Sequence, residues 1–353
     1  MIITKSINDV IYPPSVKNGF SMDNYWIWDG SVVKGDDGRY HLFASRWRKT
    51  LPMHPGWLLE SEIIRASSDT PDGVFRFEEV VLSSRGAEYW DGRSVHNPHI
   101  MKYNDKYVIY YMGTTHPFPD VEENEEITSR DPRVICARAN KRIGVAVSDS
   151  VFGPWERISE PVLDTRPDCF DNFLVSNPAP CITPEGKILL IYKTRTYAKR
   201  PYPEFLHGRM LFGIAVADAP WEKHKAILDE PLFKGSDCNL EDPFIWYDKE
   251  GYHLMAKDMT GKVCGEKLGG VYASSKDGIN WNFEIGRLFY SRTHRFDDGS
   301  EWELGNMERP FILFENGKPV CAYFAVSDGK DGLGFANCSR TWNMPLRFND
   351  SLF

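Results

Sequence analysis

A polar step followed by an apolar hairpin recurs five times along the 353-residue chain. Each copy starts with an acid, an amide or an arginine, usually before Pro, and continues into an apolar run, a turn that usually carries Gly and a second β-rich run. The copies begin at Asp29, Asn97, Asn177, Asp242 and Arg309, at intervals of 68, 80, 65 and 67 residues. A hairpin repeat of this length is typical of propeller blades, in which each copy forms one small antiparallel sheet.

A second pattern follows each hairpin in the same order. It is a strand of small residues, such as Gly-Val-Ala-Val-Ser from Gly144, and four copies run on to a Trp. Each unit therefore holds a hairpin, a third strand and, after an Asp/Gly/Pro turn, a fourth strand. An ordinary β-rich protein with frequent turns explains the two ordered patterns less well. The sequence predicts an all-β, five-bladed β-propeller with four-stranded antiparallel blades around a central funnel. We expect a single domain over residues 1–353, with blades starting near 29, 97, 177, 242 and 309.

The composition narrows the classes of partner. A net charge of −8 argues against a nucleic-acid partner, because binding phosphates requires clustered Lys and Arg. No run of 18 apolar residues is present, so no membrane partner is expected. Aromatic residues make up 14% of the chain and include 11 Trp, some of which are available to stack on sugar rings. The N-terminus lacks a basic segment followed by an apolar one, which is not typical of a secretory precursor, and the compartment stays open.

No metal or other cofactor is required by the sequence. The seven cysteines are scattered and none has the spacing of a zinc ligand, so most are expected to be reduced small hydrophobes. Oxygen ligands in the channel leave a structural Ca²⁺ open.

Polar residues precede the first apolar run of every copy. The innermost strand of each propeller blade faces the central channel, so these residues are expected to converge on one funnel. A ring of acids is costly to build, because clustered carboxylates repel one another and lose solvation. A glycosidase needs such a cluster, since one acid protonates the leaving oxygen and another acts as base or nucleophile. The five pairs are Trp28-Asp29, His96-Asn97, Ser176-Asn177, Glu241-Asp242 and Glu308-Arg309.

Two alternatives stay open within this ring. Asn before Pro is also a common turn residue, which would give Asn97 and Asn177 a structural role. Glu241 and Asp242 are adjacent, and side chains alternate along a strand, so only one of the two is expected to point inward.

Basic and aromatic residues stand at the end of the second run in three copies. Gathered at one mouth, with Arg309 inside the ring, they favour an oligosaccharide substrate that carries an anionic group or many hydroxyls. Solvated strand tips are the alternative. The candidates are Arg46, Trp47, Lys193, Arg195 and Lys257, and the candidate stacking residues are Trp26, Trp28, Trp47, Trp90 and Trp302, each of which could instead pack a blade.

Three segments, 47–62, 114–142 and 194–210, are longer than a blade connection needs. Loops of this length in a compact domain are usually functional or disordered. The acidic run at 122–126 is typical of a solvated loop, whereas the Arg, Tyr and His residues favour anion binding. Ordinary solvated loops are the alternative for these residues too. The basic residues and Tyr are Arg48, Lys49, His54, Arg130, Arg133, Arg138, Lys141, Arg142, Arg195, Lys199, Arg200, Tyr202, His207 and Arg209, and Trp47 and Trp57 lie among them.

The chain resembles the five-bladed glycosidases of glycoside hydrolase families 43 and 117. The resemblance rests on Trp-Ile-Trp-Asp-Gly-Ser around Asp29, on Glu-Asp-Pro-Phe-Ile at Asp242 and on Met-Glu-Arg-Pro at Glu308. These families typically use a first-blade Asp as base, a second Asp that orients and tunes, and a later acid as proton donor. The resemblance therefore implies Asp29 as base, Asp242 as tuning acid and Glu308 as donor, with Glu241 as the alternative donor.

Two features depart from those families. Family 43 usually has its second Asp in a middle blade, where this chain has Asn97 and Asn177; Asp171 is a substitute unless it belongs to a loop. Family 117 often uses a His as acid, for which His96 and His99 are the nearest candidates. The inverting outcome typical of these families therefore stays open.

Three functions fit the sequence. The leading one is an exo-acting glycoside hydrolase that removes a terminal sugar from a plant or algal polysaccharide fragment. The second is a phosphorylase resembling family 130, for which Arg46, Lys193, Arg195 and Lys257 would supply the phosphate site. The third is a non-catalytic sugar-binding propeller, whose blades would repeat more evenly and need no acids in the central ring.

Overall fold

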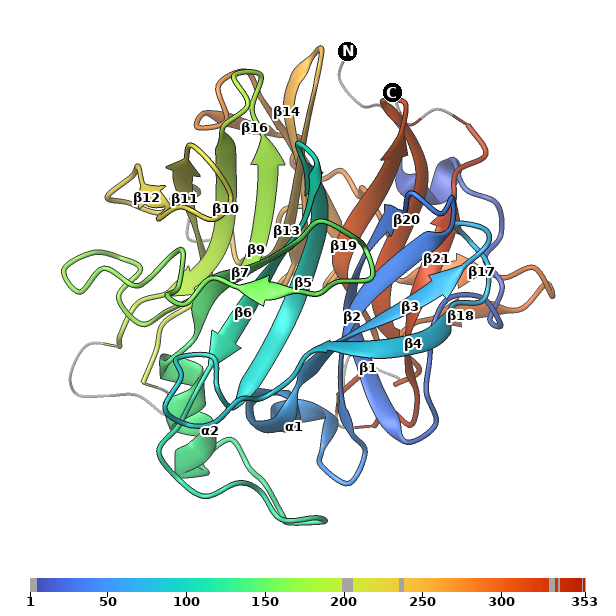
Figure 1. The fold of residues 1–353 in the computed structure, drawn as a ribbon. Coiled ribbons are helices and arrows are strands. Elements are labelled where there is room, and N and C mark those ends of the chain that lie inside the picture. The colour runs from blue at the N-terminus through green and yellow to red at the C-terminus, as the bar shows by residue number, and fades with distance from the viewer. Residues whose placement is uncertain are drawn as a thin grey trace.

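The computed structural model describes residues 5–198, 206–234, 238–329, 334–335, 337–350 and 352. Its antiparallel sheets form a ring, in which each innermost strand packs against those of the neighbouring sheets (Figure 1). Four sheets have four strands and a fifth has three. The predicted all-β, five-bladed propeller is therefore confirmed.

Strands follow one another from the channel outward in every blade. The first blade contains β1 (Tyr25–Lys34), β2 (Tyr40–Arg48), β3 (Glu62–Ser68) and β4 (Arg76–Leu82). The second contains β5 (Ser94–Tyr103), β6 (Lys106–Thr114), β7 (Arg142–Ser148) and β8 (Glu156–Arg157). The third contains β9 (Leu174–Ile182), β10 (Ile188–Arg195), β11 (Leu211–Ala217) and β12 (Lys225–Ala226). The fourth contains β13 (Leu240–Asp248), β14 (Gly251–Asp258), β15 (Gly270–Ser275) and β16 (Trp281–Phe283).

The fifth blade is completed from the other end of the chain. Its strands are β19 (Asn306–Glu315), β20 (Lys318–Ser327) and β21 (Thr341–Arg347). Outside β21, Phe20 bridges to Asn343 and Ile11 bridges to Phe348, both antiparallel. The segment before β1 thus takes the outer position of this blade, which the sequence patterns did not predict.

Apolar residues on both faces of the middle strands pack the blades against each other. The run Ile-Leu-Leu-Ile-Tyr at the start of β10 is buried throughout, as expected for a sheet covered on both sides. The glycines that open the third strands have a packing cause. A Cβ on Gly213 would collide with the Tyr192 ring, and one on Gly270 would collide with the Tyr290 ring. The small residues of this pattern therefore leave room for a neighbouring aromatic ring that packs against the third strand.

Two of the long insertions fold into helices. The segment 47–62 contains α1 (Met53–Glu60), and the segment 114–142 contains α2 (Pro132–Ala139). Figure 1 shows the two helices side by side at the end of the propeller opposite the chain termini, and their apolar residues share a small core. The remaining elements are the 3₁₀ turn η1 (Ile7–Asp9) and a hairpin of β17 (Thr293–Arg295) and β18 (Glu301–Glu303). No helix in the described ranges is long and apolar enough to cross a membrane.

Candidate active site

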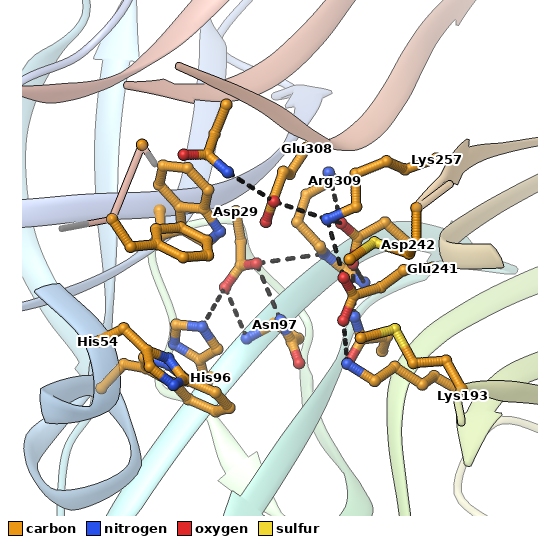
Figure 2. Close-up of a pocket in the computed structure, with 18 of the residues that line it drawn as sticks. Asp29, His54, His96, Asn97, Lys193, Glu241, Asp242, Lys257, Glu308 and Arg309 are labelled. Atoms are coloured by element: carbon orange, nitrogen blue, oxygen red, sulfur yellow. Dashed lines mark hydrogen bonds and ion pairs between the residues drawn. The ribbon is translucent and has the colours of Figure 1, made fainter. Parts of the chain in front are cut away.

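A cavity of about 520 Å³ lies at the end of the propeller that carries α1 and α2 (Figure 2). All five innermost strands and both helices contribute side chains to its lining. The structure therefore brings together most residues that the sequence places at the blade starts. From the innermost strands these are Trp28, Asp29, His96, Asn97, Asn177, Glu241, Asp242, Asn306, Glu308 and Arg309.

Every innermost strand carries the same β-bulge. Its register against the second strand shifts at one point, where one residue has a left-handed backbone with φ between 50° and 58°. Asp and Asn adopt this region more readily than other residues, and Pro suits a bulge because it cannot donate to the ladder. A bulge interrupts the alternation of side chains, so Glu241 and Asp242 both line the cavity. The expectation that only one of them points inward is wrong. The left-handed residues are Asp29, Asn97, Asn177, Asp242 and Arg309.

These five residues form what we call the polar ring. Asn97 Nδ2 donates to Asp29 Oδ1 at 2.9 Å, and Asn177 Nδ2 donates to Asp242 Oδ1 at 2.6 Å. The Arg309 guanidinium lies between the two carboxylates, with Nε 3.2 Å from Asp29 and Nη1 3.7 Å from Asp242. Both Asn side chains therefore hold the carboxylate of another blade, a structural role that differs from a turn residue bonding its own backbone.

An aromatic plug of His99, Phe244 and Phe311 closes the channel behind the polar ring. Each residue stands two positions after a ring residue, and the ring centroids are 5.1–5.8 Å apart. Burial lowers the pKa of His99 to about 3, and this imidazole does not line the cavity. His99 is thus a neutral packing residue, and within the described residues the cavity is a blind pocket.

Asp29 is the most enclosed carboxylate of the pocket. Its oxygens accept hydrogen bonds from Ser45 Oγ at 2.7 Å and from the Asn97 backbone N–H at 2.9 Å, and His96 Nε2 lies 3.1 Å away. Burial alone would raise the pKa of Asp29, but His96, Arg309 and the hydrogen bonds outweigh it and hold this pKa below its usual value. Burial also lowers the pKa of His96 to about 4, so the imidazole is neutral and donates through Nε2. A role as base would require Asp29 to give up one of these bonds.

Lys257 joins two other carboxyl groups, as Figure 2 shows. Its Nζ is 2.8 Å from Glu241 Oε2 and 2.6 Å from Glu308 Oε1, so these two oxygens are at most 5.4 Å apart, the sum of the two distances. Glu241 Oε1 also pairs with Lys193. Glu308 Oε1 accepts from Asn306 Nδ2 at 3.0 Å, whereas Oε2 accepts no hydrogen bond from any described residue. That oxygen is available to a ligand.

The surroundings lower the pKa of Glu241 and raise that of Glu308. Burial would raise the pKa of Glu241, but the ammonium groups of Lys193 and Lys257 outweigh it and hold the pKa well below the usual value. For Glu308, burial and the charges of Asp242 and Glu241 raise the pKa to about 7, against the opposing charge of Lys257. Glu241 has two cations and Glu308 shares one, so the proton resides on Glu308 near neutral pH. The pocket therefore offers one protonated and one ionised carboxyl group.

Arg46 lies outside the pocket, so the structure does not bring it together with the other predicted binding residues. Its guanidinium pairs with Glu62 at 2.7 Å and packs over the rings of Tyr25 and Phe77. Lys193 of β10 and Lys257 of β14 each stand opposite the residue that precedes the bulge of the innermost strand. In β2 the residue at this position is Ser45. Arg46 is one residue further along and so faces the other side of the sheet.

Several other candidates make packing or ion-pair contacts within the protein. Asp171 is buried against Arg166 and the Tyr192 hydroxyl, so it does not replace the middle-blade Asp of family 43. Trp47 lines the pocket but is 1% exposed and presents no open face, whereas Trp28 meets Phe335 edge-on. The remaining stacking candidates, Trp26, Trp90 and Trp302, do not line the cavity.

Several lining residues were not assigned individually from the sequence. His54, Trp57, Arg138 and Lys141 come from the two insertions that form α1 and α2, and the length of these insertions was their signal. Lys199, Arg200 and Tyr202 of the third insertion lie outside the described residues. No group of three or more His, Cys, Asp or Glu side chains in the described ranges is arranged to hold a metal ion. The lining residues without a sequence signal are Met53, Met210, Met259, Lys267, Leu268, Asn306 and Phe335.

Comparisons with known proteins place the fold. Scans against protein-family models and curated protein sequences found no match. Among solved structures, a family 117 glycoside hydrolase of the marine bacterium Zobellia galactanivorans is similar with a TM-score of 0.67 and 16% identity, over 99% of this chain and 93% of the other. A thermostable family 43 glycoside hydrolase gives 0.60 and 14%, over 96% and 92%. The Bacillus subtilis arabinanase Arb43A gives 0.57 and 12%, over 94% and 96%.

At these identities the likeness concerns the fold. The chain has the five-bladed propeller found in structures of glycoside hydrolase families 43 and 117, as its motifs predicted, and its structural neighbours are glycoside hydrolases.

Proposed function

We propose that the protein is a glycoside hydrolase that removes a terminal sugar, with Glu308 as general acid and Glu241 as the second catalytic carboxylate. The observation that carries the proposal is the bridge from Glu241 through Lys257 to Glu308. It holds a protonated and an ionised carboxyl group with oxygens no more than 5.4 Å apart. An upper bound of this size favours the short spacing of a retaining pair, about 5–5.5 Å between carboxyl groups, over the roughly 6.5–9.5 Å of an inverting pair.

Accessibility favours Glu241 over Asp29 as the partner of Glu308. The side chains of Glu241 and Glu308 are 13% and 8% exposed to the pocket, whereas that of Asp29 is fully buried. Glu241 can therefore approach a sugar without breaking the polar ring. In this proposal Asp29, which the family resemblance implies as base, positions Arg309 and Asn97.

The reaction would proceed by two displacements at the anomeric carbon. Glu241 attacks this carbon while Glu308 donates its proton to the leaving oxygen, which breaks the glycosidic bond and forms a glycosyl ester on Glu241. Glu308, now ionised, takes a proton from water, and the resulting hydroxide equivalent attacks the same carbon and releases Glu241. Lys193 and Lys257 stabilise the carboxylate that departs in this second step. Two inversions give a product of retained configuration.

The blind end of the pocket supports action on a terminal sugar. The aromatic plug closes the channel behind the polar ring, and α1 and α2 wall the mouth. A chain passing through the site would need a second opening. A pocket of about 520 Å³ suits one or two sugar residues.

Hydrolysis of aryl glycosides and of algal or pectic oligosaccharides, followed by proton NMR, tests both activity and stereochemistry. We expect a monosaccharide of retained configuration to be released without phosphate. Glu308→Gln should lose turnover of substrates with poor leaving groups, and Glu315→Gln, a surface change on the same strand β19, should not. An inverted product would exclude the double displacement and return the role of base to Asp29.

Reaction with azide distinguishes the nucleophile, Glu241 in this proposal, from the general acid, Glu308. With an activated substrate, Glu241→Ala should yield a glycosyl azide of inverted configuration, because azide then replaces the missing nucleophile. Glu308→Ala should yield the azide of retained configuration, because the ester on Glu241 still forms. Hydrolysis at the wild-type rate in Glu241→Ala would contradict the assignment.

A phosphorylase is the second candidate, because cations outnumber carboxyl groups in the pocket. Phosphate would then replace water in releasing the sugar. Turnover that requires phosphate and yields a sugar phosphate would decide for this reaction, and the same assays without phosphate would show none.

A further inference from the structure

The pocket lining carries a charge opposite in sign to that of the whole chain. The chain has a net charge of −8, yet among the described residues seven Lys and Arg side chains and four carboxyl groups line the cavity. Three of these cations, Lys193, Lys257 and Arg309, contact the carboxylates described above. Four positive charges are left over, on Arg138, Lys141, Arg195 and Lys267.

Three of the four form a cationic wall of Arg138, Lys141 and Arg195, which touches no carboxylate of the described residues. Lys141 is 2% exposed, and its Nζ lies 4.8 Å from the centre of the Trp57 ring without a hydrogen bond in the described part of the chain. Arg138, in the last turn of α2, likewise makes no side-chain hydrogen bond to a described residue. Arg195, at the end of β10, donates through Nη1 to the Gly208 carbonyl at 2.7 Å.

Glu241 is the one described carboxylate that offsets the mutual repulsion of this wall, and it does so only in part. Burial, reinforced by Lys193, Arg138 and Arg195 and opposed by Glu241, lowers the pKa of Lys141 well below its usual value. Burial and the charge of Arg195 lower the pKa of Arg138 to about 10. A buried cation without a partner destabilises the folded protein. A bound anion would relieve both the repulsion and the lost solvation.

We infer that Arg138, Lys141 and Arg195 bind an acidic substituent of the substrate, a carboxylate or a sulfate ester, and so select acidic sugars. This inference rests on the proposed glycosidase function, because the wall lines the same pocket as Glu241. Guanidinium forks match the paired oxygens of such groups, and a buried ammonium adds a point charge. Lys193 links the wall to the ionised Glu241. A singly charged group is repelled less by that carboxylate than a phosphate dianion, which favours a sugar substituent over free phosphate.

Binding measured by calorimetry on the full chain tests the inference without turnover. D-glucuronate, D-galacturonate and D-galactose 6-sulfate are titrated beside glucose, galactose and inorganic phosphate. We expect at least one acidic sugar to bind about tenfold or more tightly than its neutral counterpart. Arg138→Gln and Lys141→Met should each remove this preference. Arg130→Gln, which removes an exposed charge from the same insertion, should keep it.

Two results would overturn the inference. One is equal binding of acidic and neutral sugars, or a preference that survives in both wall variants. The other is inorganic phosphate binding more tightly than every acidic sugar, which would assign the wall to free phosphate. Turnover of neutral glycosides without preferential binding of acidic sugars would refute this inference but not the proposed hydrolase function. Preferential binding of acidic sugars without hydrolysis of acidic glycosides would refute the hydrolase function but not the role of the cationic wall.

Discussion

Replacing Glu308 by Gln tests the protonation state of the proposed catalytic pair, Glu241 and Glu308, without any substrate. Burial raises the pKa of Glu308 from 4.5 to about 7, so between these values the folded protein holds a proton that the unfolded chain releases. The contribution to stability is fully present below pH 4.5 and is lost as the pH rises through 7. A rise of this size corresponds to roughly 3 kcal/mol, most of which develops between pH 5 and pH 8.

Gln has nearly the same shape and no charge to lose, so Glu308→Gln should escape this loss. An entropy of unfolding of about 0.7 kcal/mol/K for a chain of this length converts roughly 2 kcal/mol into about 3 °C. Scanning calorimetry at pH 5 and pH 8 should therefore show the Tm of the variant, relative to wild type, rising by about 3 °C between the two conditions.

Glu315→Gln is the control with the opposite sign. The Glu315 carboxylate accepts from Lys34 and Tyr40, which lower its pKa, so its contribution is present above the unfolded pKa and lost in acid. Both pH 5 and pH 8 lie above the unfolded pKa of 4.5, so the Tm of this variant relative to wild type should stay nearly constant between them. If the Tm difference for Glu308→Gln is the same at both pH values, Glu308 is ionised in the folded protein and its role as acid fails.

Three other changes test the surrounding charges. Asp29→Asn leaves Arg309 in a buried site without its nearest carboxylate and should cost about 3–5 kcal/mol in urea denaturation; a cost under about 1 kcal/mol would show that the ion pair is not needed. Lys257→Met removes the charge that favours ionised Glu308, so the alkaline limb of the kcat/KM profile should move to higher pH, and an unmoved limb would contradict the coupling. Binding of glucuronate should raise the lowered pKa of Lys141, so calorimetry should show the affinity for glucuronate falling as the pH rises, and an affinity that is the same at acid and alkaline pH would contradict this coupling.

The fold could be predicted because the polar step and the small-residue strand each reflect a different structural requirement of every blade. The polar step before Pro marks a bulge that each innermost strand needs, and the small residues mark where rings such as that of Tyr192 cross the third strand. These constraints repeat in all blades and so are visible as a period. The outer edge of the last blade was not predicted, because the segment around Ile11 and Phe20 pairs with β21 only once in the molecule.

Pocket residues that belong to the repeated blade pattern were predicted from the sequence. Pocket residues whose position depends on a contact formed once in the molecule were not. Asp29, Glu241 and Glu308 could be identified because the starts of all innermost strands must lie around the same channel. The direction of Arg46 could not, because it depends on where the bulge shifts the register. The wall residues Arg138 and Lys141 reach the pocket through the packing of α2 on α1, a tertiary contact without a sequence period.

The aromatic plug fixes the order in which products can depart. With the far end of the channel closed by His99, Phe244 and Phe311, whatever enters must leave through the mouth it came in by. In the proposed reaction the fragment nearer the mouth goes first, and the cleaved sugar behind it goes last. In steady-state kinetics the free sugar should then compete with an aryl glycoside for the empty enzyme, whereas the released phenol should not. Turnover would be governed by how quickly the sugar is removed from the surrounding solution.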